Sequence, residues 1–428
     1  MGRTARSAQG PAESAQGPVR SARGRAREAI LDAIRAAEPL SRVEIAAATG
    51  LTEASVSMTV RRLLDEGLVV ETGRTPTAGK PRTLLRLDPA ARIAVGVYLD
   101  AGRATFVLTG QTGGIISRLA RPLSSTPSGA AVSAVSADEL AAGVVVLLAG
   151  SGVDAARCAG IGLAGSGLPV TLGGELSAAT GMNVLVENEA TAAAIGEYWV
   201  ARLGPERSFA ALHMGSGIGA GIVVGGQALR GGEFGHFCVR VDGPPCWCGA
   251  RGCLEAVAGP RAVVAAASAN PQAAAEAELP LSPAAASPHP APGPRGFPPG
   301  SRQPAGSRQS AGSPQSAGSR GVAADFAAVA RAARAGAPAC LALLEESATY
   351  VAAAAESVVN LLDLDLVVLT GAGFAAASFV YGPAIQRRIA PADARTWHRA
   401  VTVTVSLAAA TASATGAAAL VLQPHLRH

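Results

Sequence analysis

The residues best suited to bind a metal ion lie in one short stretch of the sequence, residues 231–255. One imidazole and four thiols occur there, separated mainly by small residues; His236, Cys246, Cys248 and Cys253 are the candidate ligands, and Cys238 would be a spare thiol. One histidine and three cysteines form a common ligand set for a tetrahedral Zn²⁺ ion. Because protein ligands would fill all four positions and leave none for a water molecule, we expect a structural zinc.

The same stretch also fits a cluster of small buried thiols, or disulfides in a secreted protein. A Cys-x-Cys pair lies between Pro245 and Gly249, an arrangement that wraps backbone around an ion, whereas adjacent disulfides would be strained. No apolar run follows the N-terminal arginines, so we expect no signal peptide and a cytoplasmic location. Disulfides are rare in that reducing compartment, which favours the metal.

Length and composition predict two or three domains and no membrane partner. A chain of 428 residues is too long for one core. Hydrophobic residues make up 49% of it, but alanine accounts for many of them, and the most apolar windows are shorter than the ~20 residues of a spanning helix. Lys80 is the only lysine among 36 basic residues, so arginine must make most phosphate contacts.

Residues 26–88 carry the pattern of a winged helix-turn-helix. Apolar residues recur at helical spacing over residues 29–37; Ser41 then caps a second helix that ends at Gly50, and Thr52 caps a third. Strands are expected on both sides of the Gly/Pro-rich loop that follows, as in a wing. Three short helices with a tight turn and a wing predict double-stranded operator DNA as the partner.

The candidate DNA contacts are small polar residues on the outer side of the third helix and basic residues of the wing. They are Ser55, Ser57, Thr59 and Arg61 on the helix, and Arg74, Lys80 and Arg82 in the wing loop. The alternative is a small helical module that binds other proteins. The basic residues of the wing favour DNA, because they lie where phosphates would be. The Arg-containing tail of residues 1–25 has low complexity and is expected to be disordered, either along a nucleic-acid backbone or simply solvated.

The remainder, residues 92–428, reads as an α/β domain. Residues 93–108 predict a β-hairpin, and apolar strands flank a glycine-rich turn that contains Gly215, Ser216, Gly217 and Gly219. Such glycines let backbone N–H groups approach a phosphate, although they also suit a plain tight hairpin. Residues 265–323 are rich in Pro, Ala, Gly and Ser and are expected to be a disordered insertion.

Several motifs resemble the ROK family (repressors, open reading frames, kinases). The N-terminal domain of ROK repressors is matched by Ser41-Arg42-Val43-Glu44, Thr49-Gly50-Leu51 and Gly79-Lys80-Pro81, and the larger domain by the Asn188 segment and by Glu233-Phe234-Gly235-His236. The resemblance implies a winged helix followed by a two-lobed actin-like (ribonuclease H-like) ATPase/sugar-kinase domain. It also implies that Asn188, Glu233 and His236 bind a sugar, and that Glu189 stands at the position of the catalytic base.

The sequence departs from the kinase pattern at several points. Tyr98 stands where the family has a metal-binding Asp, and Asp100 lies in the turn that would approach the phosphates. Glu189 replaces the family's Asp, which moves the carboxylate by about 1.5 Å, and errors of ~1 Å can cost a hundredfold in rate. A sugar-contacting loop has no counterpart in residues 165–183. Glu189 also fits a simple acid on a helix surface.

These departures predict a regulator without kinase activity. We therefore expect operator DNA and a sugar or sugar-phosphate effector as partners, a homodimer or homotetramer, structural Zn²⁺, and no productive ATP/Mg²⁺ site. The alternatives are an ATP-dependent sugar kinase that carries a DNA-binding domain, and a DNA-binding protein whose large domain is only a dimerisation scaffold.

Overall fold

The computed structural model describes most of the chain. The described residues are 22–76, 81–100, 102–123, 135–204, 207–229, 233–282, 321–389 and 400–422. Lys80, residues 1–21 of the predicted tail and most of the predicted insertion lie outside these ranges.

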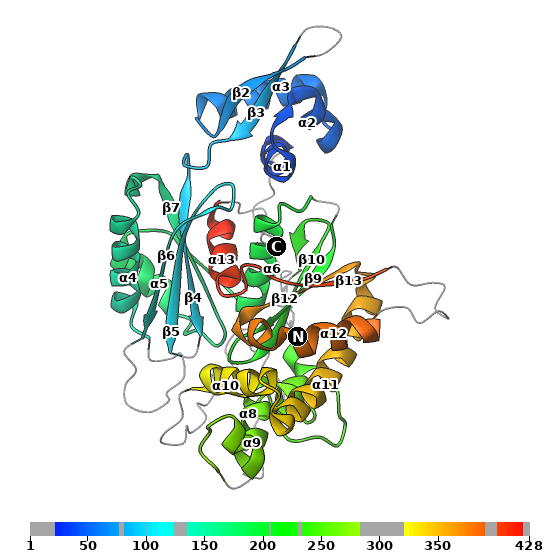
Figure 1. Ribbon diagram of the computed structural model, residues 1–428. Helices are drawn as coiled ribbons and strands as arrows, with labels where there is room; N and C mark the ends of the chain where they lie inside the picture. Colours follow the sequence, from blue (N-terminus) through cyan, green and yellow to red (C-terminus); the bar gives the residue numbers. More distant parts are fainter. Residues whose placement is uncertain are drawn as a thin grey trace, which may run out of the picture.

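The N-terminal part is a winged helix-turn-helix (Figure 1). Its elements are α1 (Ala22–Ala37), β1 (Leu40–Ser41), α2 (Arg42–Thr49), α3 (Glu53–Asp65), β2 (Val69–Thr75) and β3 (Arg82–Leu87). The three strands form an antiparallel sheet in the order β1-β3-β2. Helix α1 begins at Ala22, so the last four residues of the predicted tail, 22–25, are helical. Arg74 lies in β2 and Arg82 is the first residue of β3, so neither lies, as predicted, in the wing loop.

Local signals fix the helix ends. Ser41 forms a capping box with Glu44, and Gly50 ends α2 in the left-handed conformation with φ 67°. The Thr52 hydroxyl accepts a hydrogen bond from the Ser55 N–H and starts α3. Buried residues such as Ile34 join these helices to the sheet in one core.

The larger part has two lobes, and their five-stranded sheets share one plan. In each sheet, three antiparallel strands are followed by two parallel ones, in the orders β6-β5-β4-β7-β8 and β11-β10-β9-β12-β13. The first sheet consists of β4 (Ile93–Asp100), β5 (Arg103–Gly110), β6 (Ile115–Pro122), β7 (Cys158–Gly165) and β8 (Val184–Glu187). The second consists of β9 (Phe209–Met214), β10 (Ile218–Val224), β11 (Gln227–Ala228), β12 (Leu366–Thr370) and β13 (Thr402–Val405).

Helices cover both sheets. Those beside the first sheet are α4 (Ala137–Gly150), η2 (Ala155–Arg157) and α5 (Leu172–Thr180). The second lobe carries η3 (Phe234–His236), α7 (Leu254–Ala258), α8 (Pro260–Ala269), α9 (Pro271–Glu276), α10 (Val322–Arg334), α11 (Pro338–Leu362) and α12 (Gly371–Ile389). In the described part, no single helix is long and apolar enough to span a membrane; α10 and α11 reach that composition only as a pair bent by 113°.

Two helices, α6 (Glu189–Val200) and α13 (Ala412–Leu422), lie between the two sheets (Figure 1). Helix α13 packs on the first sheet, whereas α6 packs on β9 and β10 of the second. They approach closely because glycine faces backbone: a Cβ atom at Gly416 would lie 1.7 Å from the Ala192 carbonyl oxygen. The pair therefore forms the seam between the lobes.

The predicted start of the low-complexity insertion at residue 265 is wrong. Residues 260–276 form α8 and α9, and side chains from them, including Ala267 and Ala273, lie in the main core of the second lobe. The alanine-rich composition resembled a linker, but alanine is also the best helix former and fits between closely packed helices.

Candidate metal centre and interlobe cleft

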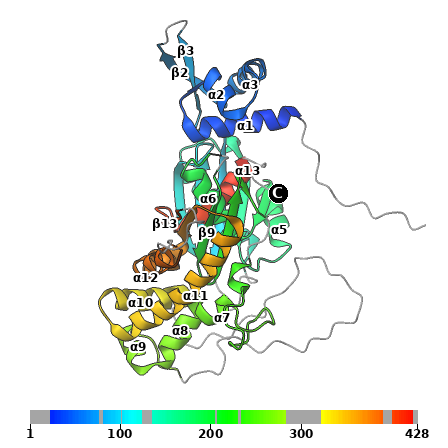
Figure 2. The same ribbon diagram turned by 90° about the vertical axis from the view of Figure 1, so that its right-hand side faces the viewer.

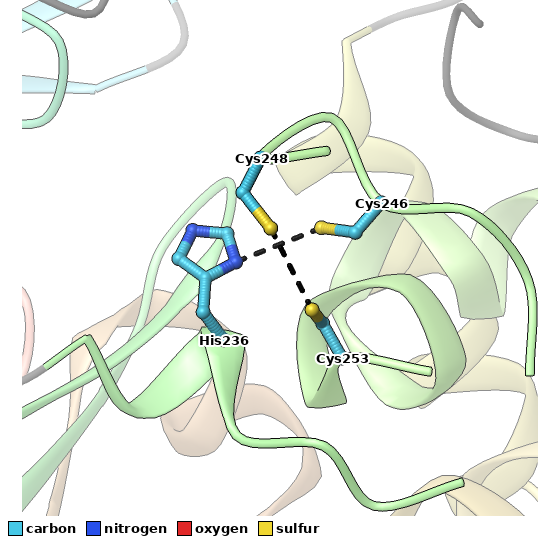
Figure 3. Close-up of side chains that lie close together, drawn as sticks. All are labelled: His236, Cys246, Cys248 and Cys253. Carbon is cyan, nitrogen blue, oxygen red and sulfur yellow. Dashed lines mark hydrogen bonds between the residues drawn. The ribbon is translucent and has the colours of Figure 1, made fainter. Parts of the chain in front are cut away.

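The four predicted metal ligands converge on one point (Figure 3). Cys246 Sγ lies 3.6 Å from His236 Nδ1, and Cys248 Sγ lies 3.7 Å from Cys253 Sγ. Ligands at the Zn–S and Zn–N distances of a tetrahedral site would be separated by about 3.6 Å for an S–N edge and about 3.8 Å for an S–S edge. These two edges suit a tetrahedral ion, and all four donor atoms lie within 4.8 Å of one another.

The loop that carries the thiols is folded by short turns. The Cys246 N–H donates to the Ala250 carbonyl and the Gly249 N–H to the Cys246 carbonyl. Gly252 has φ 65°, and a Cβ atom there would lie 1.5 Å from the Arg240 carbonyl oxygen, so only glycine fits. The last thiol, Cys253, is at the N-terminal end of α7.

Burial favours the protonated form of these thiols when no cation is bound. Cys246 and Cys253 are buried, and burial raises the pKa of both thiols. All six cysteines of the chain are free, including the exposed Cys238. A bound divalent cation would instead stabilise the thiolates, so the donor set fits a metal.

His236 connects the candidate metal site to the cleft. Its Nδ1 atom faces the cysteines, whereas Nε2 lies 3.8 Å from the Glu233 carboxylate. The Trp247 ring packs edge-on against the imidazole, with ring centroids 4.8 Å apart. A metal on Nδ1 would hold the ring so that Nε2 points toward the exposed Glu233.

A small cavity lies between the two lobes. It is lined by Tyr98, Leu99, Asp100 and Ser166 from the first lobe and by Glu189, His213 and residues 215–217 from the second. Its volume of about 30 Å³ accommodates about two water molecules and no larger ligand.

The predicted phosphate loop is closed by side chains of β4. The Ser216 N–H donates to Asp100 Oδ1 over 3.1 Å, so a carboxylate takes the place that a phosphate oxygen would need. A Cβ atom at Gly215 would lie 2.7 Å from the Tyr98 hydroxyl. Gly215, Ser216 and Gly217 form the predicted turn, but Gly219 does not belong to it: it lies in β10, pairs with His213 and packs on Ala190 of α6.

Asn188 begins α6 at the edge of this cavity. Its side-chain oxygen accepts hydrogen bonds from the backbone N–H groups of Ala190 and Thr191, at 2.8 and 3.2 Å. Its amide nitrogen donates to the Glu189 carboxylate over 3.3 Å. Asn188 is exposed to solvent next to Glu189, which lines the cavity.

Two carboxyl groups near the cavity are hard to ionise. Burial raises the pKa of Glu189 to about 7, and the neighbouring Asp100, Glu233 and Glu255 carboxylates act in the same direction. Burial likewise raises the pKa of Glu255 to about 7, although this carboxylate accepts a hydrogen bond from the Ile218 N–H at 2.7 Å. The cavity is therefore acidic and unsuited to another anion.

The sequence did not reveal a buried polar chain behind the cavity. The Thr370 hydroxyl donates to the Leu212 carbonyl, so it accepts from His213 Nδ1 at 3.0 Å. His213 Nε2 then accepts the Tyr98 hydroxyl proton, also at 3.0 Å. Burial lowers the pKa of His213 to about 4, which keeps the imidazole neutral. The only available signal was a lone histidine in an apolar strand just before a glycine turn.

Helix α3 carries candidate DNA contacts, and we call it the reading helix. The candidate contacts differ in how exposed they are. Ser57 and Arg61 are exposed, as are Arg74 and Arg82 at the base of the wing. Ser55 and Thr59 instead line a groove between α3 and α1. The groove also exposes Met58 and Arg62, which the sequence interpretation omitted.

Comparison with known proteins is consistent with both parts. Residues 166–424 match the sequence profile of the ROK family, and residues 29–80 match that of the MarR family. A glucokinase from Thermotoga maritima is 43% identical over 99 residues, which are 22% of this chain and 31% of that protein. A putative xylose repressor from Caldicellulosiruptor sp. is 28% identical over 263 residues, 55% of this chain and 64% of the relative. The chain thus spans less than two thirds of either relative.

A solved structure extends the likeness to nearly the whole chain. It is described as a ROK family transcriptional regulator, homolog of the E. coli MLC protein, and matches with a TM-score of 0.61 at 20% identity. The match covers 94% of this chain and 96% of that one. At this identity the likeness bears on the fold alone, and it confirms the predicted winged helix followed by a two-lobed sugar-kinase-like domain.

Proposed function

The chain belongs to the ROK family, and from this premise and the geometry of its two sites we propose that it is a DNA-binding transcriptional repressor with a sensory, non-catalytic sugar-kinase-like domain. The observation that carries the proposal is the contact between Asp100 and Ser216. A protein carboxylate occupies the glycine turn on which a kinase would hold phosphate, while the winged helix keeps an exposed reading face. The MarR-family match over residues 29–80 also supports DNA as the partner.

The effector we propose is a neutral sugar. Names of the two relatives, a glucokinase and a putative xylose repressor, support a monosaccharide. Asn188, Glu233 and His236 lie on elements around the cleft and offer amide, carboxylate and imidazole groups for hydroxyls. The surrounding carboxylates would repel a sugar phosphate, so the acidic cavity argues for the uncharged form.

Zinc is the metal we propose for the His236, Cys246, Cys248 and Cys253 cluster. One imidazole and three thiolates with tetrahedral spacing match its preferred ligands. When bound, the ion would cross-link the loop of residues 236–253 through its four ligands and orient His236 at the cleft. We further propose a cytoplasmic homodimer or homotetramer, since paired winged helices read paired half-sites on DNA.

Two measurements on the full chain test the proposed function. In the first, the protein selects duplexes from a random DNA pool, and we expect one recurrent sequence to emerge. In the second, an ATP-coupled assay over a panel of hexoses and pentoses should show no turnover above that of a Glu189→Ala variant. Turnover that disappears in Glu189→Ala would overturn the proposal in favour of a sugar kinase. Selection without sequence enrichment would overturn the proposed recognition of operator DNA.

A further inference from the structure

A buried arginine of the winged helix caps a helix of the second lobe. Arg35, in α1, is fully buried, and its guanidinium donates to the carbonyl oxygens of Tyr198 and Trp199, both at 3.3 Å, and of Leu203 at 2.9 Å. These carbonyls lie at the C-terminal end of α6, where a cation also interacts favourably with the helix dipole. Figure 2 shows α1 lying across this end of the two-lobed domain.

A second buried residue of α1 holds this contact in place. Asp32 Oδ1 accepts from Arg35 Nε at 2.9 Å, and its other oxygen accepts from the Tyr198 hydroxyl at 2.8 Å. The Arg35 guanidinium also lies 4.6 Å from the centroid of the Tyr198 ring. A buried ion pair whose groups are hydrogen-bonded in this way has one defined geometry. We call Asp32, Arg35 and Tyr198 the α6 anchor.

The winged helix is held separately by the first lobe. Gln111, in the turn between β5 and β6, is buried and donates from Nε2 to the carbonyl oxygens of Leu68 and Asp88, at 2.7 and 2.6 Å. The covalent connection from β3 to β4 enters the same lobe. The DNA-binding domain is therefore fastened to both lobes, at different points.

Helix α6 and strand β4 each have one end beside the cavity. Helix α6 starts at Asn188 and Glu189 beside the cavity and, at about 1.5 Å per residue, runs about 18 Å to the end that Arg35 caps. Strand β4 ends at Asp100, which lines the cavity from the first lobe. The cavity has room for only about two waters. A monosaccharide is larger than this space, so it would either bind at the open side of the cavity or change the spacing of the lobes.

We propose that the α6 anchor and Gln111 make the winged helix a sensor of the position of one lobe relative to the other. When a sugar changes the position of one lobe relative to the other along the seam between α6 and α13, the two attachment points shift relative to each other, and helix α3 is reoriented. This inference rests on the proposed function, because it requires both DNA and a sugar to bind. It assigns the regulatory coupling to three side chains of the α6 anchor and to Gln111.

The test measures coupling and binding separately in the full chain. Affinity for a duplex selected by the wild-type chain is measured with and without saturating D-glucose or D-xylose, and sugar affinity is measured by calorimetry. In the wild type, one of these sugars should change the DNA dissociation constant by about tenfold, a usual size for allosteric coupling. In Tyr198→Phe and in Gln111→Met, that factor should fall below about twofold, while both separate affinities stay close to wild type.

The Arg35→Lys substitution should reduce the coupling between sugar and DNA binding most, and Arg207→Lys is its matched control. Both substitutions keep the charge but remove a guanidinium. Arg207 pairs with Asp365 at 3.3 Å within the second lobe and belongs neither to the α6 anchor nor to the Gln111 contact. The control should keep wild-type coupling. If Arg35→Lys melts too low for measurement, Tyr198→Phe and Gln111→Met carry the same test, since each removes hydrogen bonds and keeps the side-chain bulk.

The outcomes separate the inference from the proposed function. Wild-type coupling in all anchor variants would overturn the inference and leave the proposed function intact. A wild-type chain that binds DNA and both sugars independently of each other would overturn the inference and the sensory role of the large domain, but not the DNA-binding role. A wild-type chain that binds neither the DNA nor the sugars would overturn both.

Discussion

Asp100 Oδ1 lies 3.1 Å from the backbone nitrogen of Ser216, so a carboxylate of the first lobe is a ligand of the second lobe's glycine turn. The turn keeps the backbone donors of a phosphate site, but the protein itself supplies the anion. This contact fits the proposed loss of kinase activity, because the Ser216 N–H is satisfied in the absence of ATP.

Removing that carboxylate should open the turn to phosphate. We expect Mg²⁺–ADP to bind the wild type no more tightly than about 1 mM, and Asp100→Ala to bind at least about tenfold more tightly, because one repulsive charge and one competing acceptor are lost. Isothermal titration calorimetry measures both. Micromolar nucleotide binding by the wild type would contradict the closed turn.

The metal centre can be tested by single substitutions. Cys246→Ser or Cys248→Ser should lose about one zinc per chain and lower Tm on the order of 10 °C, because the binding energy of a structural metal contributes to folding. The control is Cys238→Ser, whose side chain is exposed and outside the cluster. Metal analysis with thermal unfolding provides the readout. Equal metal content in all three variants, or none in the wild type, would refute the site.

Both the winged helix and the ligand cluster were predictable because their signals are local. Ser41 and Thr52 cap helices by bonding to backbone within three residues of themselves. Cys246, Cys248 and Cys253 must lie near one another because few residues separate them. The chemistry of such short segments follows from residue type and spacing.

The α6 anchor could not be predicted, because it joins residues far apart in the chain. Asp32 meets Tyr198, 166 residues later, and nothing in either local sequence marks the pair. The helices around Ala267 and Ala273 were missed for another reason: alanine-rich segments form linkers and tightly packed helices alike, and only the packing partners decide. Glycine spacing similarly placed Gly219 in a turn, although its strand pairing puts it against α6.

The raised pKa of Glu189 predicts a pH-dependent stability. Burial moves it from 4.5 toward about 7, so between these pH values the folded state holds a proton that the unfolded state has released. The free energy of unfolding therefore falls as pH rises through this window, by about 1.4 kcal/mol per pH unit at most for this group. Above pH 7 the dependence levels off.

A Glu189→Gln variant isolates this contribution, because it cannot ionise. Relative to wild type, it should be more stable at pH 8 than at pH 5, as measured by urea unfolding at the two pH values. The Glu255 carboxyl is present in both proteins, and because it interacts with Glu189 the measured difference includes the loss of this interaction. A stability difference between variant and wild type that is the same at both pH values would contradict the assigned burial of Glu189.

The residues of the DNA interface should fall into two groups: those that contact phosphates and position the protein, and those that read the base sequence. Arg82→Ala, in the wing, should weaken binding to all duplexes alike and reduce the slope of log K against log salt by about 1, as expected for one lost phosphate contact. Arg61→Ala, on the exposed face of α3, should instead relax the preference for the selected sequence by about 1–3 kcal/mol. Titrations at several salt concentrations distinguish these effects. Equal losses on selected and scrambled DNA would remove Arg61 from the reading group.

Recognition of a DNA sequence through the winged helix is the main requirement of the proposed function. Its most direct test is the ratio of affinities of the full chain for the duplex it selects from a random pool and for a scrambled duplex, both at physiological salt. We predict a ratio of at least about 10³, the lower end for specific DNA-binding proteins. Equal affinity for the two duplexes would contradict the claim.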